Sequence, residues 1–222
     1  MRNHPILPDS YFFPRVFQAN LNRLYTRVVR AALDLLPTHA DALIEGHGPE
    51  AELLARLAMQ VDNHTAEEAR RAFALVLAAT FERQLRLWAR MVLPRAEAAR
   101  VAKCEIDRLL HRVVEVRGLQ LAPDVRAAIA EVQLLANVVR HGDGRACDAL
   151  RKVAPNLWVP SVETFDQSMP ASPLESDGLR IAPDDLGRYA SALFRFWGTA
   201  DTLPMATVEA PETLPQGTVA FR

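Results

Sequence analysis

Apolar residues recur at steps of three and four along most of the chain, which is the spacing of amphipathic helices. The pattern predicts helices at about 14–35, 50–59, 65–93, 95–117 and 123–141, a short helix at 145–154 and a last one at 184–198. No stretch of useful length shows the alternation of apolar and polar residues that marks a half-buried strand. The sequence therefore predicts an all-α protein.

Local signals predict where several of these helices begin and end. Thr65 and Glu68 have the spacing of a capping box, in which a hydroxyl and a carboxylate satisfy free N–H groups at a helix start. Pro94 marks a break, Gly118 suits a left-handed C-cap, and Gly142 follows the end of another helix. Short connections between the third, fourth and fifth helices favour an antiparallel bundle.

Prolines interrupt the C-terminal third of the chain, where residues 156–183 contain Pro160, Pro170, Pro173 and Pro183. Such a segment is typical of an irregular linker or strap. We therefore expect an antiparallel bundle of about five main helices over 1–155, a strap over 156–183, a C-terminal helix over 184–201 that packs on the bundle, and a loose, disordered tail over 202–222.

Composition and charge exclude several classes of protein. The 222 residues are 50% hydrophobic and 24% charged, which is enough for a sizeable core and too apolar for disorder throughout. The 26 basic residues, all but two of them Arg, are balanced by 27 acidic ones, so no overall basic character points to nucleic acid. No signal peptide or membrane span is evident, and Cys104 and Cys147 fit a reducing compartment. We expect a soluble, cytoplasmic protein.

Common catalytic and metal motifs are missing from the sequence. It has no phosphate-binding glycine loop, no dinucleotide fingerprint, no His-Glu-x-x-His and no nucleophile elbow. No two histidines lie three or four residues apart on one helix; they are His4, His39, His47, His64, His111 and His141. We expect neither a metal nor a cofactor.

The predicted helix 123–141 carries a polar strip between two apolar sides. The strip consists of Gln133, Asn137, Arg140 and His141. Asn137 and His141 are four residues apart and so are neighbours on one face. A purely structural interpretation is available, because cationic residues in a last turn complement the helix dipole.

The segment 131–144 (EVQLLANVVRHGDG), with its Asn137 and its Arg-His-Gly at the end of a late helix, resembles the HEPN superfamily. The helices that precede it fit the same architecture. The resemblance implies a helical bundle that dimerises through its motif-bearing helices. It also implies a metal-independent ribonuclease of a bacterial toxin–antitoxin or phage-defence system, with RNA as substrate. Asn137 matches the family's polar residue and His141 its histidine.

The family's motif arginine has no counterpart here, because the positions open to it hold Leu134, Leu135 and Ala136. In an active enzyme, His141 would move a proton and the neighbouring Arg140 would hold phosphate oxygens, while Asn137 would orient His141 or the phosphate. The alternative is a non-catalytic helical subunit that regulates or binds a partner protein, or a nucleotide binder that uses the same strip.

Three further residues are candidates for a binding role. Gln133 belongs to the strip itself, whereas Gln84 lies near the centre of the apolar arc of the helix predicted at 65–93. A buried amide of this kind needs hydrogen-bond partners, and a neighbouring side chain or backbone group is the simplest one. Arg83, next to it, could face the strip.

Overall fold

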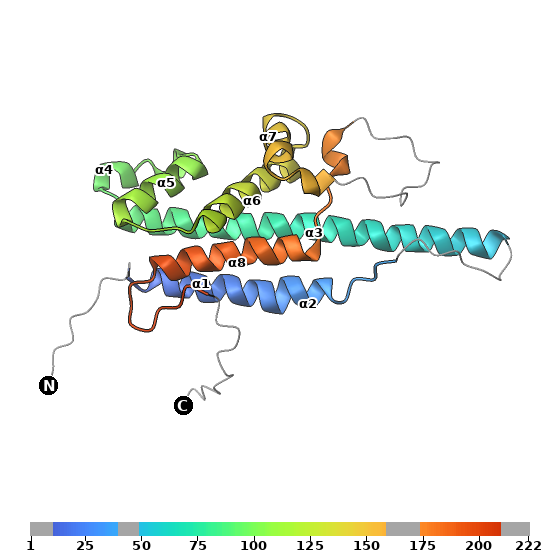
Figure 1. Cartoon of the computed structure of the whole chain (residues 1–222), viewed down its shortest axis with the longest axis horizontal. Coiled ribbons are helices and arrows are strands. Elements are labelled where there is room, and N and C mark those ends of the chain that lie inside the picture. The colour runs from blue at the N-terminus through green and yellow to red at the C-terminus, as the bar shows by residue number, and fades with distance from the viewer. Residues whose placement is uncertain (1–10, 40–48, 159–173, 210–222) are drawn as a thin grey trace, which may run out of the picture. The chain divides into compact units, whose positions relative to one another are not determined.

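The computed structural model describes residues 11–39, 49–158 and 174–209 (Figure 1). These residues form a packed helical bundle without strands, which confirms the all-α prediction. The chain divides into two compact units. Unit 1 comprises Met1–Arg23, Thr80–Arg126 and Ala190–Arg222, and unit 2 comprises Leu24–Ala79 and Ala127–Tyr189. Each is considered below over its described residues.

The N-terminal helical segment agrees with the helix predicted at 14–35. It consists of α1 (Phe13–Leu24), a π-helical turn η2 (Tyr25–Val29) and α2 (Arg30–Leu33), without a break between them. The segment ends before Pro37, whose ring cannot continue a helix.

The helices predicted at 50–59 and 65–93 are in fact one helix, α3 (Pro49–Val92). The predicted capping box is wrong: the Thr65 hydroxyl donates to the Val61 carbonyl at 2.8 Å, a bond to the preceding turn within a continuing helix. The physical reason is that neither Gly nor Pro occurs between residues 50 and 93, so nothing local forces the helix to end.

The helix predicted at 95–117 is broken into three pieces. They are α4 (Arg95–Ala98), the 3₁₀ turn η3 (Val101–Lys103) and α5 (Ile106–Arg117). Cys104 and Glu105 between them are extended, with ψ near 140° (136° and 144°). At the break Val101 is buried in the core of unit 1 and its carbonyl accepts from Arg86 of α3, so burial and a tertiary hydrogen bond compensate for the lost helical bonds. Gly118 ends α5 in the predicted left-handed conformation, with φ at 62°.

The next two helices follow the sequence closely. α6 spans Pro123–His141 and α7 spans Arg145–Val153, as predicted. Between them Gly142 has φ at 73°, a value that favours glycine. The described ends of the predicted strap carry two 3₁₀ turns, η4 (Pro155–Trp158) and η5 (Glu175–Gly178). These turns contact one another, since Trp158 Nε1 donates to the Glu175 carbonyl at 2.9 Å. Residues 159–173 lie outside the described part.

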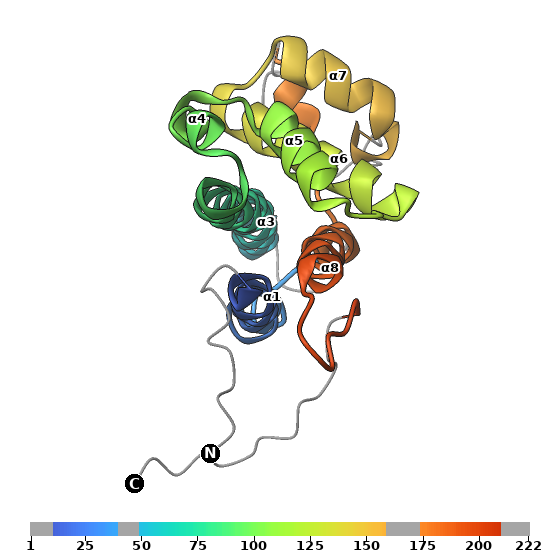
Figure 2. The same cartoon turned by 90° about the vertical axis from the view of Figure 1, so that its left-hand side faces the viewer.

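The last helix, α8 (Pro183–Ala200), supplies the centre of unit 1. Its Trp197 contacts rings from three directions, at centroid distances of 4.9 Å to Phe17 of α1, 5.8 Å to Phe81 and 5.5 Å to Trp88, both of α3. Figure 2 shows α1, α3 and α8 end-on. Through these contacts the last helix packs against α1 and α3.

The tail predicted as loose is held against α1 over its described part, 202–209. Gln18 Nε2 donates to the Thr207 carbonyl at 2.8 Å, and Arg15 donates to the Pro204 carbonyl at 2.8 Å. The approach requires Gly198, because a Cβ there would lie 2.3 Å from the Thr207 oxygen. The rest of the tail, 210–222, is outside the described residues.

Unit 2 has an aliphatic core drawn from several helices. Its fully buried members include Leu77 of α3, Val132 and Leu135 of α6, Leu150 of α7 and Leu186 of α8.

Within the described ranges, no helix is long and apolar enough to cross a membrane.

Candidate functional site

The polar strip predicted on α6 lies in unit 2 and runs from buried to exposed. Gln133 is only 7% exposed, Asn137 is half-buried, and Arg140 and His141 are exposed in the last turn. The Nε2 of Gln133 has no hydrogen-bond partner in the described structure. The helix is apolar on both sides of the strip, as its sequence indicates.

The three residues assigned to catalysis have unengaged side chains. Within the described part of the chain, Asn137, Arg140 and His141 form no side-chain hydrogen bond and no ion pair. Asp143, the nearest carboxylate along the chain, accepts instead from the backbone N–H groups of Ser176 at 2.7 Å and Glu175 at 3.1 Å. The Ser176 N–H is the main cause of the lowered pKa of Asp143. The strip therefore presents one histidine and one arginine to solvent without a partner that orients them.

The other two predicted binding residues belong to unit 1 and are described apart from the strip. Gln84 Nε2 donates to Asn20 Oδ1 at 3.0 Å, while its Oε1 has no partner among the described residues. Arg83 donates to the Thr80 hydroxyl at 3.1 Å, one turn back on α3. Gln84 thus has the neighbouring side-chain partner that the sequence analysis expected.

A partly buried polar cluster in unit 2 links α6 to α8. Tyr189 Oη donates to Glu131 Oε1 at 2.6 Å, and Arg188 holds both oxygens of the same carboxylate at 2.6 and 3.0 Å. Burial, and then the hydrogen bond to Glu131, raise the pKa of Tyr189. Because the carboxylate is satisfied from two sides, the cluster acts as a structural connection between helices.

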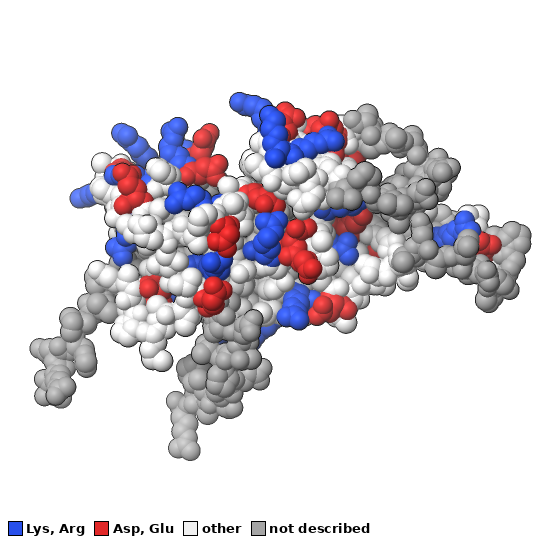
Figure 3. Space-filling view, in the orientation of Figure 1, with Lys and Arg blue, Asp and Glu red and all other residues white. Residues whose placement is uncertain are grey.

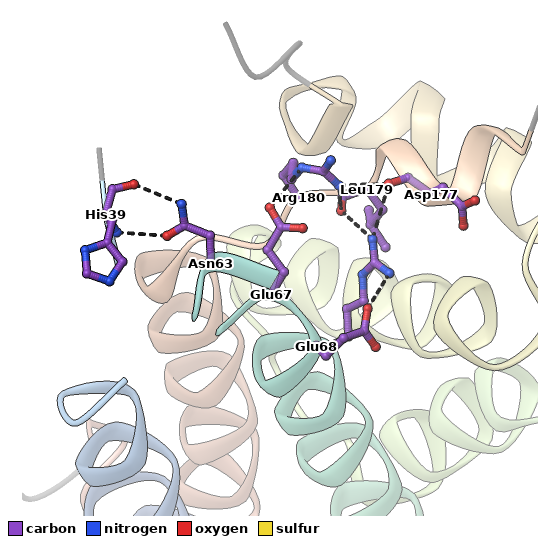
Figure 4. Close-up of polar contacts among 8 residues, drawn as sticks. His39, Asn63, Glu67, Glu68, Asp177, Leu179 and Arg180 are labelled. Carbon is purple, nitrogen blue, oxygen red and sulfur yellow. Dashed lines mark hydrogen bonds and ion pairs between the residues drawn. The ribbon is translucent and has the colours of Figure 1, made fainter. Parts of the chain in front are cut away.

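The first half of α3 also holds its neighbours through side-chain contacts (Figure 4). Asn63 exchanges two hydrogen bonds with the backbone of His39, at 2.8 and 3.0 Å. Glu67 pairs with Arg180 at 3.1 Å, and Arg71 donates to the Leu179 carbonyl at 3.1 Å. These contacts tie α3 to the segments before it and before α8, all within unit 2.

A cavity of about 680 Å³ lies in unit 1, where the chain breaks between α4 and α5. Its lining combines buried apolar residues with basic ones, among them Arg100, Lys103, Arg108 and His111. Figure 3 shows Lys and Arg side chains projecting over α4 and α5, with acidic side chains among them. The sequence pattern predicts a continuous helix there and therefore does not indicate a cavity. The run of basic residues from 100 to 112 was the signal available.

Metal-binding chemistry finds no support in the described ranges, where no group of three or more His, Cys, Asp or Glu residues is placed to hold an ion.

Comparisons with protein-family models, curated proteins and solved structures find no match for this chain.

Proposed function

We propose that the protein is a HEPN-like, metal-independent ribonuclease of a bacterial toxin–antitoxin or phage-defence system, acting in the cytoplasm. One observation carries the proposal: His141 ends α6 with its ring exposed and unengaged, directly after Arg140 and one turn beyond Asn137. Histidine is the side chain that most readily takes and gives a proton close to neutral pH, and here its ring is open to solvent.

The chemistry needs few groups. His141 removes the proton of a ribose 2′-hydroxyl, whose oxygen attacks the adjacent phosphorus. The bond from phosphorus to the 5′-oxygen breaks, and a protonated imidazole gives its proton to that oxygen. The products are a 2′,3′-cyclic phosphate and a 5′-hydroxyl. Arg140 holds the phosphate oxygens by a forked contact, in place of the motif arginine that the sequence lacks.

A homodimer through α6 supplies what one chain lacks. In-line displacement needs a base on one side of the phosphorus and an acid on the other. With two α6 helices side by side across a two-fold axis, one His141 serves as the base and its copy in the partner as the acid. Asn137, one turn earlier on the same face, then orients the imidazole or the phosphate.

The test is cleavage of structured RNA in the presence of EDTA by the wild-type protein and His141→Ala. We expect new ends that carry 2′,3′-cyclic phosphate with the wild type and none with the variant. His64→Ala is the matched control, since His64 is exposed on α3 outside the strip. Equal cleavage by His141→Ala, or no cleavage by the folded wild type, would contradict the proposal.

A specific observation favours a second function, that of a partner-binding subunit. The first turns of α3 carry four exposed apolar side chains, Leu53, Leu54, Leu57 and Val61, each between 44% and 64% exposed. Side chains of this kind, gathered on one helix, are typical of a protein interface. We infer a second copy of this chain as the partner.

The register of the helix supports self-association. When two copies of α3 pair antiparallel about Leu57, that residue faces its own copy and Leu53 faces Val61. This register keeps the apolar side chains of the two copies opposite one another. Leu57→Arg should then convert a dimer into a monomer by light scattering, while Leu87→Arg, at another exposed position of α3, should not. A wild-type monomer at high concentration would overturn this candidate.

A further inference from the structure

The cavity beside α5 has a buried apolar floor. Leu93 at the end of α3, Val101 of η3 and Leu109 of α5 line it, and each is buried in the core of unit 1. These side chains present aliphatic surface to a concave space. Such a floor accommodates the apolar body of a small molecule and offers it no hydrogen bonds.

The rim of the cavity carries several cationic side chains that are not paired with acids. Arg100, Lys103, Arg108 and His111 are exposed and line it. Within the described residues, none of the four has a side-chain hydrogen bond or an ion pair. Three permanent cations around one depression produce a positive potential that attracts anions.

The acidic residue that lines the cavity is already paired. Glu97 lines the cavity, but both its oxygens accept from Arg112, at 2.7 and 2.8 Å. That hydrogen bond is the main cause of the lowered pKa of Glu97, so the carboxylate is ionised and already compensated. Arg112 also pairs with Glu115, which lies outside the lining. Glu105 and Asp107 flank the start of α5 and do not line the cavity either.

Contacts on α3 hold the irregular wall of the cavity in place. Arg86 pairs with Glu82 at 2.8 Å and donates from its other nitrogen to the Val101 carbonyl. That carbonyl belongs to the 3₁₀ turn that interrupts the helical pattern. The depression is therefore built before any ligand arrives, which lowers the cost of binding.

We propose that this cavity binds an organic phosphate of nucleotide size. Its apolar body lies on Leu93, Val101 and Leu109, and its phosphate groups contact Arg100, Lys103 and Arg108. The volume of about 680 Å³ falls within the range of small-molecule sites, roughly 300–1,000 Å³. Several cations around one rim suit a ligand with several negative charges, because a single carboxylate would leave most of them unmatched. This site is independent of the α6 strip and of the ribonuclease proposed above.

The two cysteines provide a direct readout of binding. Cys104 lines the cavity and is half-buried, whereas Cys147 is 1% exposed in unit 2. Alkylation of the folded protein by iodoacetamide should therefore modify Cys104 first. A ligand in the cavity should slow that reaction and leave Cys147 unaffected.

The experiment measures protection of Cys104 and calorimetric binding with three probes: ATP, adenosine and inorganic tripolyphosphate. We expect ATP to bind and to protect Cys104. Adenosine lacks the phosphates and tripolyphosphate lacks the apolar body, so each should bind at least tenfold more weakly. Failure of ATP to bind or protect would overturn the proposal. Tripolyphosphate binding as tightly as ATP would overturn the role of the floor.

Variants test whether ATP binds at this cavity rather than to positive charge elsewhere on the protein or to the α6 strip. The double variant Arg100→Ala/Arg108→Ala should lose ATP affinity by about tenfold per contact or more, since hydrogen bonds to charged groups are strong. Arg126→Ala, an exposed arginine of unit 1 outside the cavity, should bind ATP like the wild type. His141→Ala should also bind normally. Equal loss in the Arg126 variant would overturn the assignment to this cavity.

Discussion

The two compact units are stabilised by different contacts, and each carries a different kind of candidate site. Unit 1 is built around Trp197 and the rings that surround it, and its cavity arises where the chain departs from helical geometry. Unit 2 has an aliphatic core and a carboxylate, Glu131, that accepts from Tyr189 and Arg188, and its candidate site is a strip on a regular helix. A polar strip on a regular helix can be recognised in the sequence from the helical spacing of its residues. A cavity at a break between helices has no such periodic pattern.

The largest effect should follow from removal of the ring at the centre of unit 1. Trp197→Ala should lower the free energy of unfolding by about 3–5 kcal/mol, because the cavity left behind loses contacts with several rings. Urea denaturation followed by circular dichroism measures this loss. Trp158→Ala is the matched control: Trp158 is half-buried in unit 2, so its removal should cost clearly less. Equal losses would show that the aromatic centre does not distinguish unit 1.

The next effect concerns the partly buried polar cluster of unit 2. Tyr189→Phe keeps the ring but removes the hydrogen bond to Glu131, and should cost about 1–3 kcal/mol because a largely buried carboxylate loses a donor. Denaturation at pH 7 provides the measurement. A variant as stable as the wild type would mean that Arg188 alone satisfies Glu131.

The same tyrosine makes an alkaline prediction. Because burial raises the pKa of Tyr189 above its ordinary value of 10.0, the phenol ionises more easily in the unfolded chain than in the fold. Its contribution to stability is complete below pH 10 and is lost as the pH rises further. The stability of the wild type should therefore fall more steeply above pH 10 than that of Tyr189→Phe. Parallel curves would contradict this.

A smaller effect is expected at the turn after α6. Backbone N–H groups, that of Ser176 foremost, hold the pKa of Asp143 below its ordinary value of 3.8. The stabilisation is present above pH 3.8 and disappears as the pH falls through the lower pKa of the folded state. Asp143→Asn should accordingly be less stable than the wild type at neutral pH and approach it in acid. Hydrogen exchange at 175–176 should report the same loosening locally.

The smallest effect on stability is expected at the strip itself. His141 is exposed and has no partner in the described structure, so His141→Ala should change the free energy of unfolding by less than about 0.5 kcal/mol. Thermal melts of the two proteins at the same pH check this. A large destabilisation would mean that His141 has a structural role, and it would remove the basis for assigning lost RNA cleavage to chemistry.

Several features of the fold could be predicted because local residues specify them. α6 begins at Pro123 and is followed by Gly142, and the structure places its ends where these residues indicate. Gly118 ends α5 for the same kind of reason, since a left-handed residue there suits only glycine without strain. The strip of α6 was also visible, because its residues recur with the helical period.

Other features could not be predicted, because weak local signals compete with packing. Thr65 and Glu68 have the spacing of a helix start, yet α3 continues through both residues. The segment between 59 and 65, where the pattern predicts a gap between two helices, contains neither Gly nor Pro to end a helix. The opposite error occurred at 95–117, where a helical pattern without Gly or Pro is broken so that Val101 becomes buried.

The sequence by itself determined the all-α class, the ends of α6 and α7, and the residues that share the polar strip. Helical periodicity, proline and glycine act over a few residues, so these features need no information about distant parts of the chain. Only the tertiary structure decided that α3 is continuous, that the chain breaks before α5, and that Arg100, Lys103 and Arg108 gather around an apolar floor. The reason is that burial is a property of the packed core: it depends on side chains that are distant in sequence and meet only after folding.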